Sequence, residues 1–392
     1  MELKPVIVLS GQTAGLGVIR ALGAKGVPMT VVYHDPREMG RASRYVNRQM
    51  RLPDPEAEET QFIDCLMDDR LFQAGEVLIP TSDATLAAAS RHKDRLSQKF
   101  IVACPDWNIT RQFLEKKLTA EIAQRVGIST PRTFLPTSLA DIRNLEGTLQ
   151  FPALAKPSQS HLYRKYFDRK MTMVNNMVEL TAAYREAEAV GVELMVQEYI
   201  PGPDSQGANY NAYFVDGEPL VEFTAQKIRS SPPQMGSPSA LISRPLPELM
   251  EQGRKILSSV GFTGFACSEY KRDARDGQYK LIEVNVRHNL SSLLAVACGQ
   301  NFPWIDYQYY AAGVSPLPTY FQEGVYWVDI SRDVRPWLPL VARGEYPLKD
   351  FITPYLRRHV YAIMSWQDFK PMLGKFGDSL TWMMRRPLEA AR

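Results

Sequence analysis

The chain lacks the sequence features of secreted, membrane-spanning and zinc-finger proteins. Its four cysteines, Cys65, Cys104, Cys267 and Cys298, are scattered without a CxxC pair, which indicates neither a zinc site nor a disulfide framework and favours a reducing cytoplasm. No apolar run approaches the roughly 18 residues of a membrane span, and the N-terminal MELKPVIVLSG lacks the charged start and long apolar core of a secretion signal. The net charge of +3 gives little reason to expect nucleic-acid binding. We therefore expect a cytoplasmic protein.

The length of 392 residues exceeds what one hydrophobic core usually supports, so two or three domains are expected. A hydrophobic content of 45% with 23% charged residues is typical of a soluble globular enzyme. Apolar runs that end in polar loops alternate with helical segments, from VIVLSG through MTVVYHD and EVLIPTSD to FIVACPD. This alternation predicts an open parallel α/β domain over residues 1–110.

The first strand-to-helix turn is rich in glycine. Gly11, Gly15 and Gly17 lie in GQTAGLG, and Asp35 follows near the distance at which an acid holds a ribose. The glycines are spaced GxxxGxG instead of GxGxxG, and a tight turn explains them as well as a dinucleotide does. An NAD-dependent oxidoreductase is therefore a weak alternative that rests on this segment alone.

The region after residue 110 shows a different pattern, in which extended segments are joined by tight turns. A helix is expected between Thr110, a capping residue, and Gly127. Two later pairs of strands turn at Asp216-Gly217 and near Asp276-Gly277, which are hairpin signals. The region is therefore predicted to be α+β, with antiparallel hairpins.

KLIEVNVRH, residues 280–288, is a strand with one apolar and one polar face. The polar face carries Glu283, Asn285 and Arg287. A solvated face is the common explanation, but asparagine is depleted in strands and its amide needs partners. Oxygens of Glu283 and Asn285 would lie about 6–7 Å apart, a spacing that suits a hard cation.

The hairpin that contains this strand brings a second acid into play. If its loop has an odd number of residues, Glu269 lies opposite Glu283, whereas a two-residue loop would put Tyr270 there. Two facing carboxylates repel each other unless a positive charge lies between them. Two carboxylates and one amide oxygen leave positions for phosphate oxygens and water, which suits Mg²⁺ bound with a nucleotide.

Two further segments supply groups that a nucleotide needs. Lys156 ends the apolar run FPALA, where an ammonium either meets an anion or extends to water. In QEYIPGPD, Gln197 and the backbone of Tyr199 and Ile200 can hydrogen-bond an adenine edge, with Asp204 close enough for a ribose. An ordinary strand followed by a Pro-Gly turn is the alternative.

The order of LEKKL, FPALAKPS, VQEYIPG, AQKIR, an acid on one strand and EVN on the next resembles the ATP-grasp superfamily of carboxylate ligases, over about residues 5–310. The resemblance implies a pre-ATP-grasp α/β domain at 1–110 and a two-lobed ATP-grasp domain at 111–320, with lobes of about 111–203 and 204–320. It also implies the following roles: Lys117 and Lys156 contact phosphates; Gln197, Glu198, Tyr199 and Ile200 hold adenine; Asp204 holds ribose; Lys227 contacts the γ-phosphate; Glu269, Glu283 and Asn285 bind magnesium; and Arg287 steadies the acyl phosphate.

The activity that this resemblance implies is ATP-dependent ligation of a carboxylate to an amine through an acyl phosphate, with release of ADP and phosphate. Mg²⁺ is the expected ion, with Mn²⁺ as an alternative. The segments KIRSSPPQMGSPS and EVNVRHNLSS look most similar to the D-aspartate ligase-like group, although substrate choice does not transfer with a fold. A nucleotide-binding regulatory module without turnover is a second hypothesis, and a homodimer is one alternative for the oligomeric state.

One segment departs from the family pattern. Where many members close a glycine-rich loop over the phosphates, this chain has SQSHLYRKYFDRKM, without glycine. Its polar side chains either bind phosphates by charge or form a solvated loop. They are His161, Tyr163, Arg164, Lys165, Arg169 and Lys170.

Residues 321–392 form a basic, tryptophan-containing extension that is expected to be helical. From Arg332 to Arg392 there are eleven Lys and Arg against six Asp and Glu. Such a segment either packs on its own domain or contacts a membrane surface or a lipid-linked acceptor. The sequence leaves both interpretations open.

Overall fold

The computed structural model describes residues 3–157 and 171–374. By its internal contacts the chain divides into two units. The larger unit comprises residues 1–128, 203–270 and 283–392, and the smaller unit comprises residues 129–202 and 271–282.

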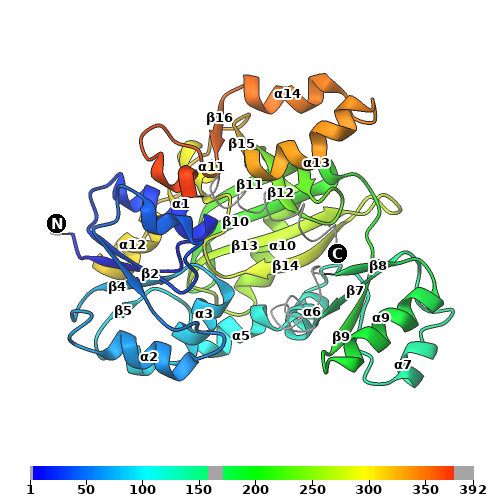
Figure 1. Cartoon of the computed structure of the whole chain (residues 1–392), viewed down its shortest axis with the longest axis horizontal. Helices are drawn as coiled ribbons and strands as arrows, with labels where there is room; N and C mark the ends of the chain where they lie inside the picture. Colours follow the sequence, from blue (N-terminus) through cyan, green and yellow to red (C-terminus); the bar gives the residue numbers. More distant parts are fainter. Residues whose placement is uncertain (1–2, 158–170, 375–392) are drawn as a thin grey trace, which may run out of the picture. The chain divides into compact units, whose positions relative to one another are not determined.

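The larger unit begins with a five-stranded sheet in the order β3-β2-β1-β4-β5, in which every neighbouring pair is parallel (Figure 1). β1 and β4 are buried along their whole length, which is why their sequences are continuous apolar runs. The predicted parallel opening is confirmed. Its strands are β1 (Val6–Leu9), β2 (Met29–Tyr33), β3 (Arg48–Arg51), β4 (Val77–Pro80) and β5 (Ile101–Val102), and its helices are α1 (Thr13–Gly23), η1 (Met39–Ala42), α2 (Glu59–Met67), α3 (Asp83–Arg91) and α4 (Lys93–Leu96).

The glycine-rich turn after β1 is explained by close packing of the backbone. A Cβ on Gly15 would lie 2.0 Å from the carbonyl oxygen of Ser10. The carbonyl of Gly11 accepts a hydrogen bond from the amide of Gly40, 2.7 Å away. Asp35 forms an ion pair with Arg37 at 2.6 Å. These contacts support the tight-turn interpretation of the glycines.

The larger unit also contains a seven-stranded sheet in the order β14-β13-β10-β11-β12-β15-β16 (Figure 1). The β10–β11 hairpin turns at Asp216 and Gly217, which both have positive φ, as the sequence predicts. The strands are β10 (Gly207–Val215), β11 (Glu218–Ser231), β12 (Ser237–Ser243), β13 (Gly264–Arg272), β14 (Tyr279–Asn285), β15 (Tyr326–Val328) and β16 (His359–Tyr361). The unit also contains α5 (Trp107–Leu114), α6 (Lys116–Arg125), η2 (Asp204–Gln206), α10 (Pro247–Ser258), α11 (Ser292–Ala297) and α12 (Phe302–Ala312).

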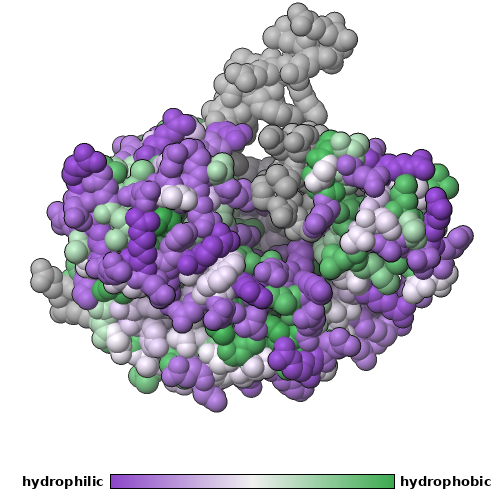
Figure 2. All heavy atoms as spheres, turned by 90° about the horizontal axis from the view of Figure 1, so that it is seen from below, coloured by the Kyte–Doolittle hydropathy of each residue, from purple (hydrophilic) through white to green (hydrophobic). Residues whose placement is uncertain are grey.

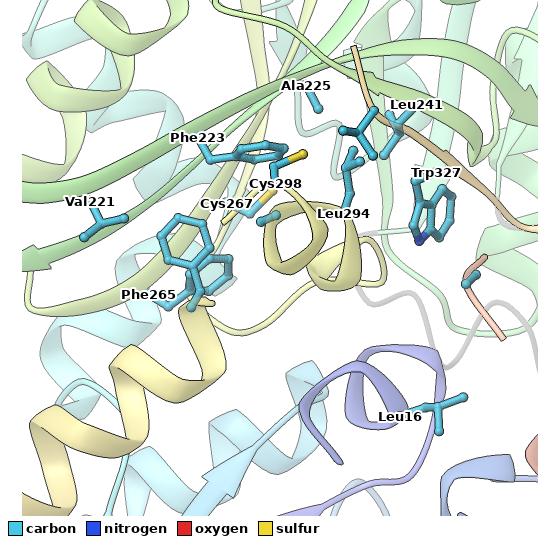
Figure 3. Close-up of a cluster of buried hydrophobic side chains, with 14 of the residues drawn as sticks. Leu16, Val221, Phe223, Ala225, Leu241, Phe265, Cys267, Leu294, Cys298 and Trp327 are labelled. Atoms are coloured by element: carbon cyan, nitrogen blue, oxygen red, sulfur yellow. The ribbon is translucent and has the colours of Figure 1, made fainter. Parts of the chain in front are cut away.

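Apolar side chains of this sheet pack against α11 in the core shown in Figure 3. Phe223 of β11 and Cys267 of β13 lie beside Leu294 of α11, and all three are at most 1% exposed. Side chains two residues apart on a strand share a face. Glu269 is therefore expected on the same face as Cys267, one step beyond this apolar core.

The smaller unit contains a four-stranded sheet in the order β6-β9-β7-β8, in which every neighbouring pair is antiparallel. Its apolar core is made by side chains from this sheet and from α7 and α9. The elements are β6 (Thr133–Phe134), α7 (Leu139–Arg143), β7 (Ala153–Pro157), β8 (Thr172–Val174), α9 (Met177–Ala189) and β9 (Leu194–Glu198).

The C-terminal segment contains the expected helices, α13 (Ile330–Ala342) and α14 (Leu348–Leu356). It also contains β15 and β16, which the sequence analysis missed and which extend the large sheet beside β12. The predicted domain boundaries near residues 110 and 320 both fall inside the larger unit. They therefore stay predictions.

Among residues 3–157 and 171–374, no helix is long and apolar enough to cross a membrane. Figure 2 shows one face of the molecule, on which hydrophilic and hydrophobic groups are interspersed.

Candidate active site

The polar face of β14 forms a hydrogen-bonded row. The Asn285 amide Nδ2 donates to Glu283 Oε1 at 3.1 Å, and Arg287 Nη2 donates to Asn285 Oδ1 at 3.2 Å. All three residues are partly buried. The predicted sharing of one strand face is confirmed for Glu283 and Asn285, whereas Arg287 lies two residues beyond the end of β14. The contacts among the three side chains provide the partners that an asparagine in a strand requires.

Glu269 of β13 lies next to Glu283. Burial raises the pKa of Glu269 to about 7, and the charge of Glu283 and a hydrogen bond between the two side chains act in the same direction. The nearby charges of Lys227 and Arg287 oppose this shift of the pKa. Glu269 therefore holds its proton up to near neutral pH, and a divalent cation would replace that proton.

The chemistry of these donors suits a nucleotide-bound metal better than an all-protein metal cage. Within the described part of the chain, no cluster of three or more His, Cys, Asp or Glu side chains could hold a metal ion. Two carboxylates and the amide oxygen of Asn285 are what this face offers. Such a set leaves coordination positions for phosphate and water oxygens, which is how proteins usually bind Mg²⁺.

Lys227 of β11 lies close enough for its charge to lower the pKa of Glu269. It is partly buried, and its stem passes over Gly207. A Cβ on Gly207 would lie 3.1 Å from Lys227 Cδ and 3.2 Å from its Cβ. Glycine at this position therefore leaves the space that the lysine stem occupies.

Arg287 has a partner that the sequence analysis missed. Its Nε donates to Asp83 Oδ1 at 2.6 Å. Asp83 is the first residue of α3, after the capping residue Ser82. The signal in the sequence is the acid that follows the β4 strand in PTSD, but its pairing with a residue 204 positions away depends on the fold.

His288 lies three residues beyond the end of β14, so strand alternation does not decide its direction, and its contacts are with Asp306 and Phe265. It is 2% exposed, its Nε2 lies 3.1 Å from Asp306 Oδ2, and its ring stacks on Phe265 at 4.7 Å. The same residues line a small cavity of about 10 Å³ that also contacts Arg287 and Tyr310. Such a volume holds about one water molecule, and His288 has the contacts of a structural residue.

In the smaller unit, Lys156 and Gln197 contact each other. Lys156 Nζ donates to Gln197 Oε1 at 2.7 Å, and Gln197 Nε2 donates to Thr133 Oγ1 at 3.0 Å. The three residues come from the adjacent strands β7, β9 and β6. The phosphate contact of Lys156 and the adenine contact of Gln197 stay predictions.

The residues that follow Gln197 make contacts within the smaller unit. The Glu198 carboxylate pairs with Arg275 at 2.7 Å and accepts from the Arg132 amide at 3.2 Å. Lys271 Nζ lies 4.7 Å from the centre of the Tyr199 ring. Ile200 is 3% exposed. Adenine contacts of Glu198, Tyr199 and Ile200 also stay predictions.

Asp204 has a structural role that the sequence did not indicate. It is 7% exposed, and its two oxygens accept the backbone amides of Ser230 and Gln234, both at 2.9 Å. A ribose contact of Asp204 stays a prediction, as does the phosphate contact of Lys117, which is exposed on α6. Residues 158–170, which include the glycine-free loop, lie outside the described residues.

No protein-family model matches the chain. Among curated proteins it is similar to a D-aspartate ligase of Enterococcus faecium, at 26% identity over 242 residues, covering 57% of this chain and 56% of that ligase. It is also similar to a D-alanine–D-alanine ligase of Ectopseudomonas mendocina, at 26% identity over 208 residues, covering 48% of this chain and 62% of that ligase. The chain thus spans less than two thirds of the length of these relatives.

Solved structures share the fold over a larger part of the chain. An L-amino acid ligase from Bacillus licheniformis superposes with a TM-score of 0.61 at 18% identity, covering 80% of this chain and 75% of that one. A biotin carboxylase from Campylobacter jejuni superposes with a TM-score of 0.64 at 14% identity, covering 83% and 74%. The solved structures show that the chain shares their fold, and the curated ligases support the resemblance to the ATP-grasp superfamily that the sequence motifs indicate.

Proposed function

We propose that the protein is a magnesium-dependent ligase that uses ATP to activate a carboxylate as an acyl phosphate and then joins it to an amine. The observation that supports this proposal most strongly is the pair Glu269 and Glu283, held side by side with Asn285 and close to the charge of Lys227. Two adjacent carboxylates in a partly buried site favour a divalent cation. The ligases among the relatives support the same activity.

The chemistry follows from the poor reactivity of a carboxylate. Its oxygen attacks the γ-phosphorus of ATP, the bond to ADP breaks, and the resulting acyl phosphate can lose phosphate when an amine nitrogen attacks the carbonyl carbon. The amine proton is released to solvent. Phosphoryl transfer needs positioning and charge neutralisation more than a protein nucleophile, which agrees with a site built of acids, amides and cations.

Each group in the site has an assigned role in this proposal. Glu269, Glu283 and Asn285 would hold Mg²⁺ or Mn²⁺, which when bound neutralises phosphate charge. Lys227 would contact the γ-phosphate, and Arg287 would leave Asp83 to bind the acyl phosphate. The remaining nucleotide contacts are assigned to Lys117, Lys156, Gln197, Glu198, Tyr199, Ile200 and Asp204.

The test is a screen of ADP and phosphate release over pairs of carboxylates and amines. D-aspartate and D-alanine are the first acids to include, because relatives are named for them. We expect magnesium-dependent release that requires both substrates and forms an amide detectable by mass spectrometry. Tight ATP binding without release for any pair would instead favour a regulatory module, and nicotinamide binding would favour the oxidoreductase.

Metal affinity should depend on pH because Glu269 holds a proton that the metal must displace. With the pKa of Glu269 raised to about 7, we expect affinity for Mn²⁺ to fall up to about tenfold per pH unit below pH 7 and to be nearly constant above pH 8. Titration of the protein with Mn²⁺ by calorimetry between pH 5.5 and 8.5 measures this. Lys227→Met should move the plateau to higher pH, since Lys227 lowers the pKa of Glu269. A pH-independent affinity would contradict the raised pKa of Glu269.

A peripheral membrane contact of the C-terminal segment remains part of the proposal, within a cytoplasmic protein. Leu348, Ile352 and Leu356 form an exposed stripe at i, i+4 and i+8 on α14, next to Lys349 and Arg357. We expect the whole protein to co-sediment with vesicles that contain anionic lipid and less with neutral vesicles. Equal recovery of the protein in the supernatant with both kinds of vesicle would contradict the membrane contact. Analytical ultracentrifugation of the protein without lipid tests whether it is a homodimer.

A further inference from the structure

Lys227 lies where β11 loses regular pairing with its neighbours. Pairing with β10 ends at Gln226, which is opposite Ala208. Pairing with β12 shifts register twice between Lys227 and Ser230. Irregularities of this kind change the direction of side chains and weaken the hydrogen-bonded ladder. Contacts outside the ladder must therefore hold this part of the strand in place.

The strongest of these contacts is a buried ion pair with the C-terminal segment. Arg229 is 0% exposed, and its Nε and Nη2 donate to Asp333 of α13 at 2.8 and 2.7 Å. Arg229 also donates to the backbone carbonyls of Asp350 and Phe351 at 2.9 and 3.3 Å. One guanidinium thus connects the irregular end of β11 to both helices of the segment, which lie beside this sheet in Figure 1.

The acid of this pair has further partners. Asp333 accepts hydrogen bonds from Ser239 Oγ and Tyr355 Oη, both at 2.7 Å. The Phe351 ring lies 5.1 Å from the guanidinium of Arg229. Because removal of one partner leaves an uncompensated charge in the interior, the pair strongly favours a single arrangement of these elements.

The backbone next to Arg229 is also held from outside the sheet. Trp337 Nε1 donates to the carbonyl of Ser230 at 2.8 Å. The amide of Ser230 donates to Asp204 at 2.9 Å. The backbone N–H and C=O of Ser230, three residues after Lys227, therefore both hydrogen-bond to side chains outside the sheet.

We propose that Arg229 and Asp333 are positioning residues, through which the C-terminal segment 330–356 holds the end of β11 so that Lys227 stays in place over Gly207, near Glu269. The inference rests on the proposed function, because it assigns the segment a part in placing the γ-phosphate contact. It also gives α13 and α14 a role in the reaction that their distance in the sequence from the ligase motifs does not suggest.

The chain contains a matched control for this idea. A second buried pair joins Arg20 of α1 to Asp368, with Arg20 Nε 2.9 Å from Asp368 Oδ2. Asp368 also accepts from Ser43 Oγ at 2.8 Å. This pair fastens the part of the chain that follows β16 to the parallel domain, and its contacts lie on α1, on the loop around Ser43 and within residues 363–368.

The experiment compares Asp333→Asn with Asp368→Asn in the whole protein. Both changes should lower the melting temperature. Asp333→Asn should also reduce kcat/KM for ATP about tenfold or more, whereas Asp368→Asn should change it less than about threefold. If Asp333→Asn fails to fold, Trp337→Phe keeps an aromatic ring beside Tyr346 and Arg229 but removes the hydrogen bond to Ser230, and it should give a smaller loss of the same kind. Arg229→Lys, which keeps the charge, should retain more activity than Arg229→Met.

A double-mutant cycle separates positioning from general destabilisation. In a Lys227→Ala background, Asp333→Asn should cause little further loss, because the residue to be positioned is gone. Independent, multiplicative effects of the two changes, or equal effects of Asp333→Asn and Asp368→Asn on kcat/KM, would overturn the proposal. A wild-type protein that neither binds nor turns over magnesium ATP would instead refute the proposed function, so the two failures are distinguishable.

Discussion

Glu283→Gln is expected to reduce magnesium-dependent ATP turnover by about 10³-fold or more while the protein stays folded. Glutamine keeps the size of the side chain and an oxygen for Asn285, but it removes the charge that would neutralise the metal. Loss of one preorganised electrostatic group, such as an oxyanion-hole donor, typically costs about 10²–10³-fold in rate, and loss of the metal with it increases the effect. ADP release in the presence of saturating magnesium measures the change, and circular dichroism checks the fold.

Glu222→Gln is the matched control for this change. Glu222 lies on β11 of the same sheet, where it pairs with Arg254 and accepts from Tyr210 Oη at 2.8 Å. Its loss should affect stability more than turnover, so we expect ADP release within about threefold of wild type. Normal ADP release by Glu283→Gln would refute the metal-site assignment.

Glu269→Gln should make the metal-free protein more stable at alkaline pH, while removing activity. The pKa of Glu269 is raised from 4.5 to about 7 by burial and by Glu283, so the folded protein binds this proton more tightly than the unfolded chain does. The resulting loss of stability in wild type is absent below the unfolded value, grows as the pH rises, and is complete above about pH 7. Glutamine carries no charge and escapes this loss, which we expect to raise the free energy of unfolding by about 1–3 kcal/mol at pH 8.

Urea unfolding in the presence of a chelator, at pH 5 and pH 8, measures this difference. Excess Mg²⁺ should reduce the advantage of the variant, because a ligand that binds only the folded wild type stabilises it. Glu222→Gln should have the opposite sign, since it breaks an ion pair with Arg254. A Glu269→Gln protein that is less stable than wild type at pH 8 would show that the two carboxylates do not repel each other.

The stability cost expected at Glu269 and Glu283 is consistent with a functional site. Two adjacent carboxylates lower the stability of the metal-free protein. Proteins usually keep such destabilising arrangements only where function requires them. Glu222 illustrates the ordinary case in the same sheet, because it is paired with a guanidinium and a phenol. Glu269 and Glu283 repel each other, and the proposed metal ion would supply the positive charge that Arg254 supplies to Glu222.

Local patterns in the sequence were sufficient for several features. Strand alternation places Glu283 and Asn285 on one face of β14, because a strand has a period of two whatever its partners are. The strand ends at Asn285, before Arg287 and His288, which the sequence pattern had included in it. Apolar runs that end in polar loops predict the parallel opening sheet. The Asp216-Gly217 turn predicts its hairpin, since few residues adopt positive φ readily.

Other features depend on the packing of segments far apart in the chain. The contact of Arg287 with Asp83, the burial of Arg229 against Asp333, and the addition of β15 and β16 to the large sheet each join residues that no local pattern links. Asp204 likewise was predicted for a ribose and was found holding two backbone amides.

The sequence by itself determined which side chains share a strand face and where the chain turns, because these follow from backbone geometry within a few residues. Only the tertiary structure decided which of the many charged groups face one another, because each such pair depends on the free energy of burying the elements that carry it.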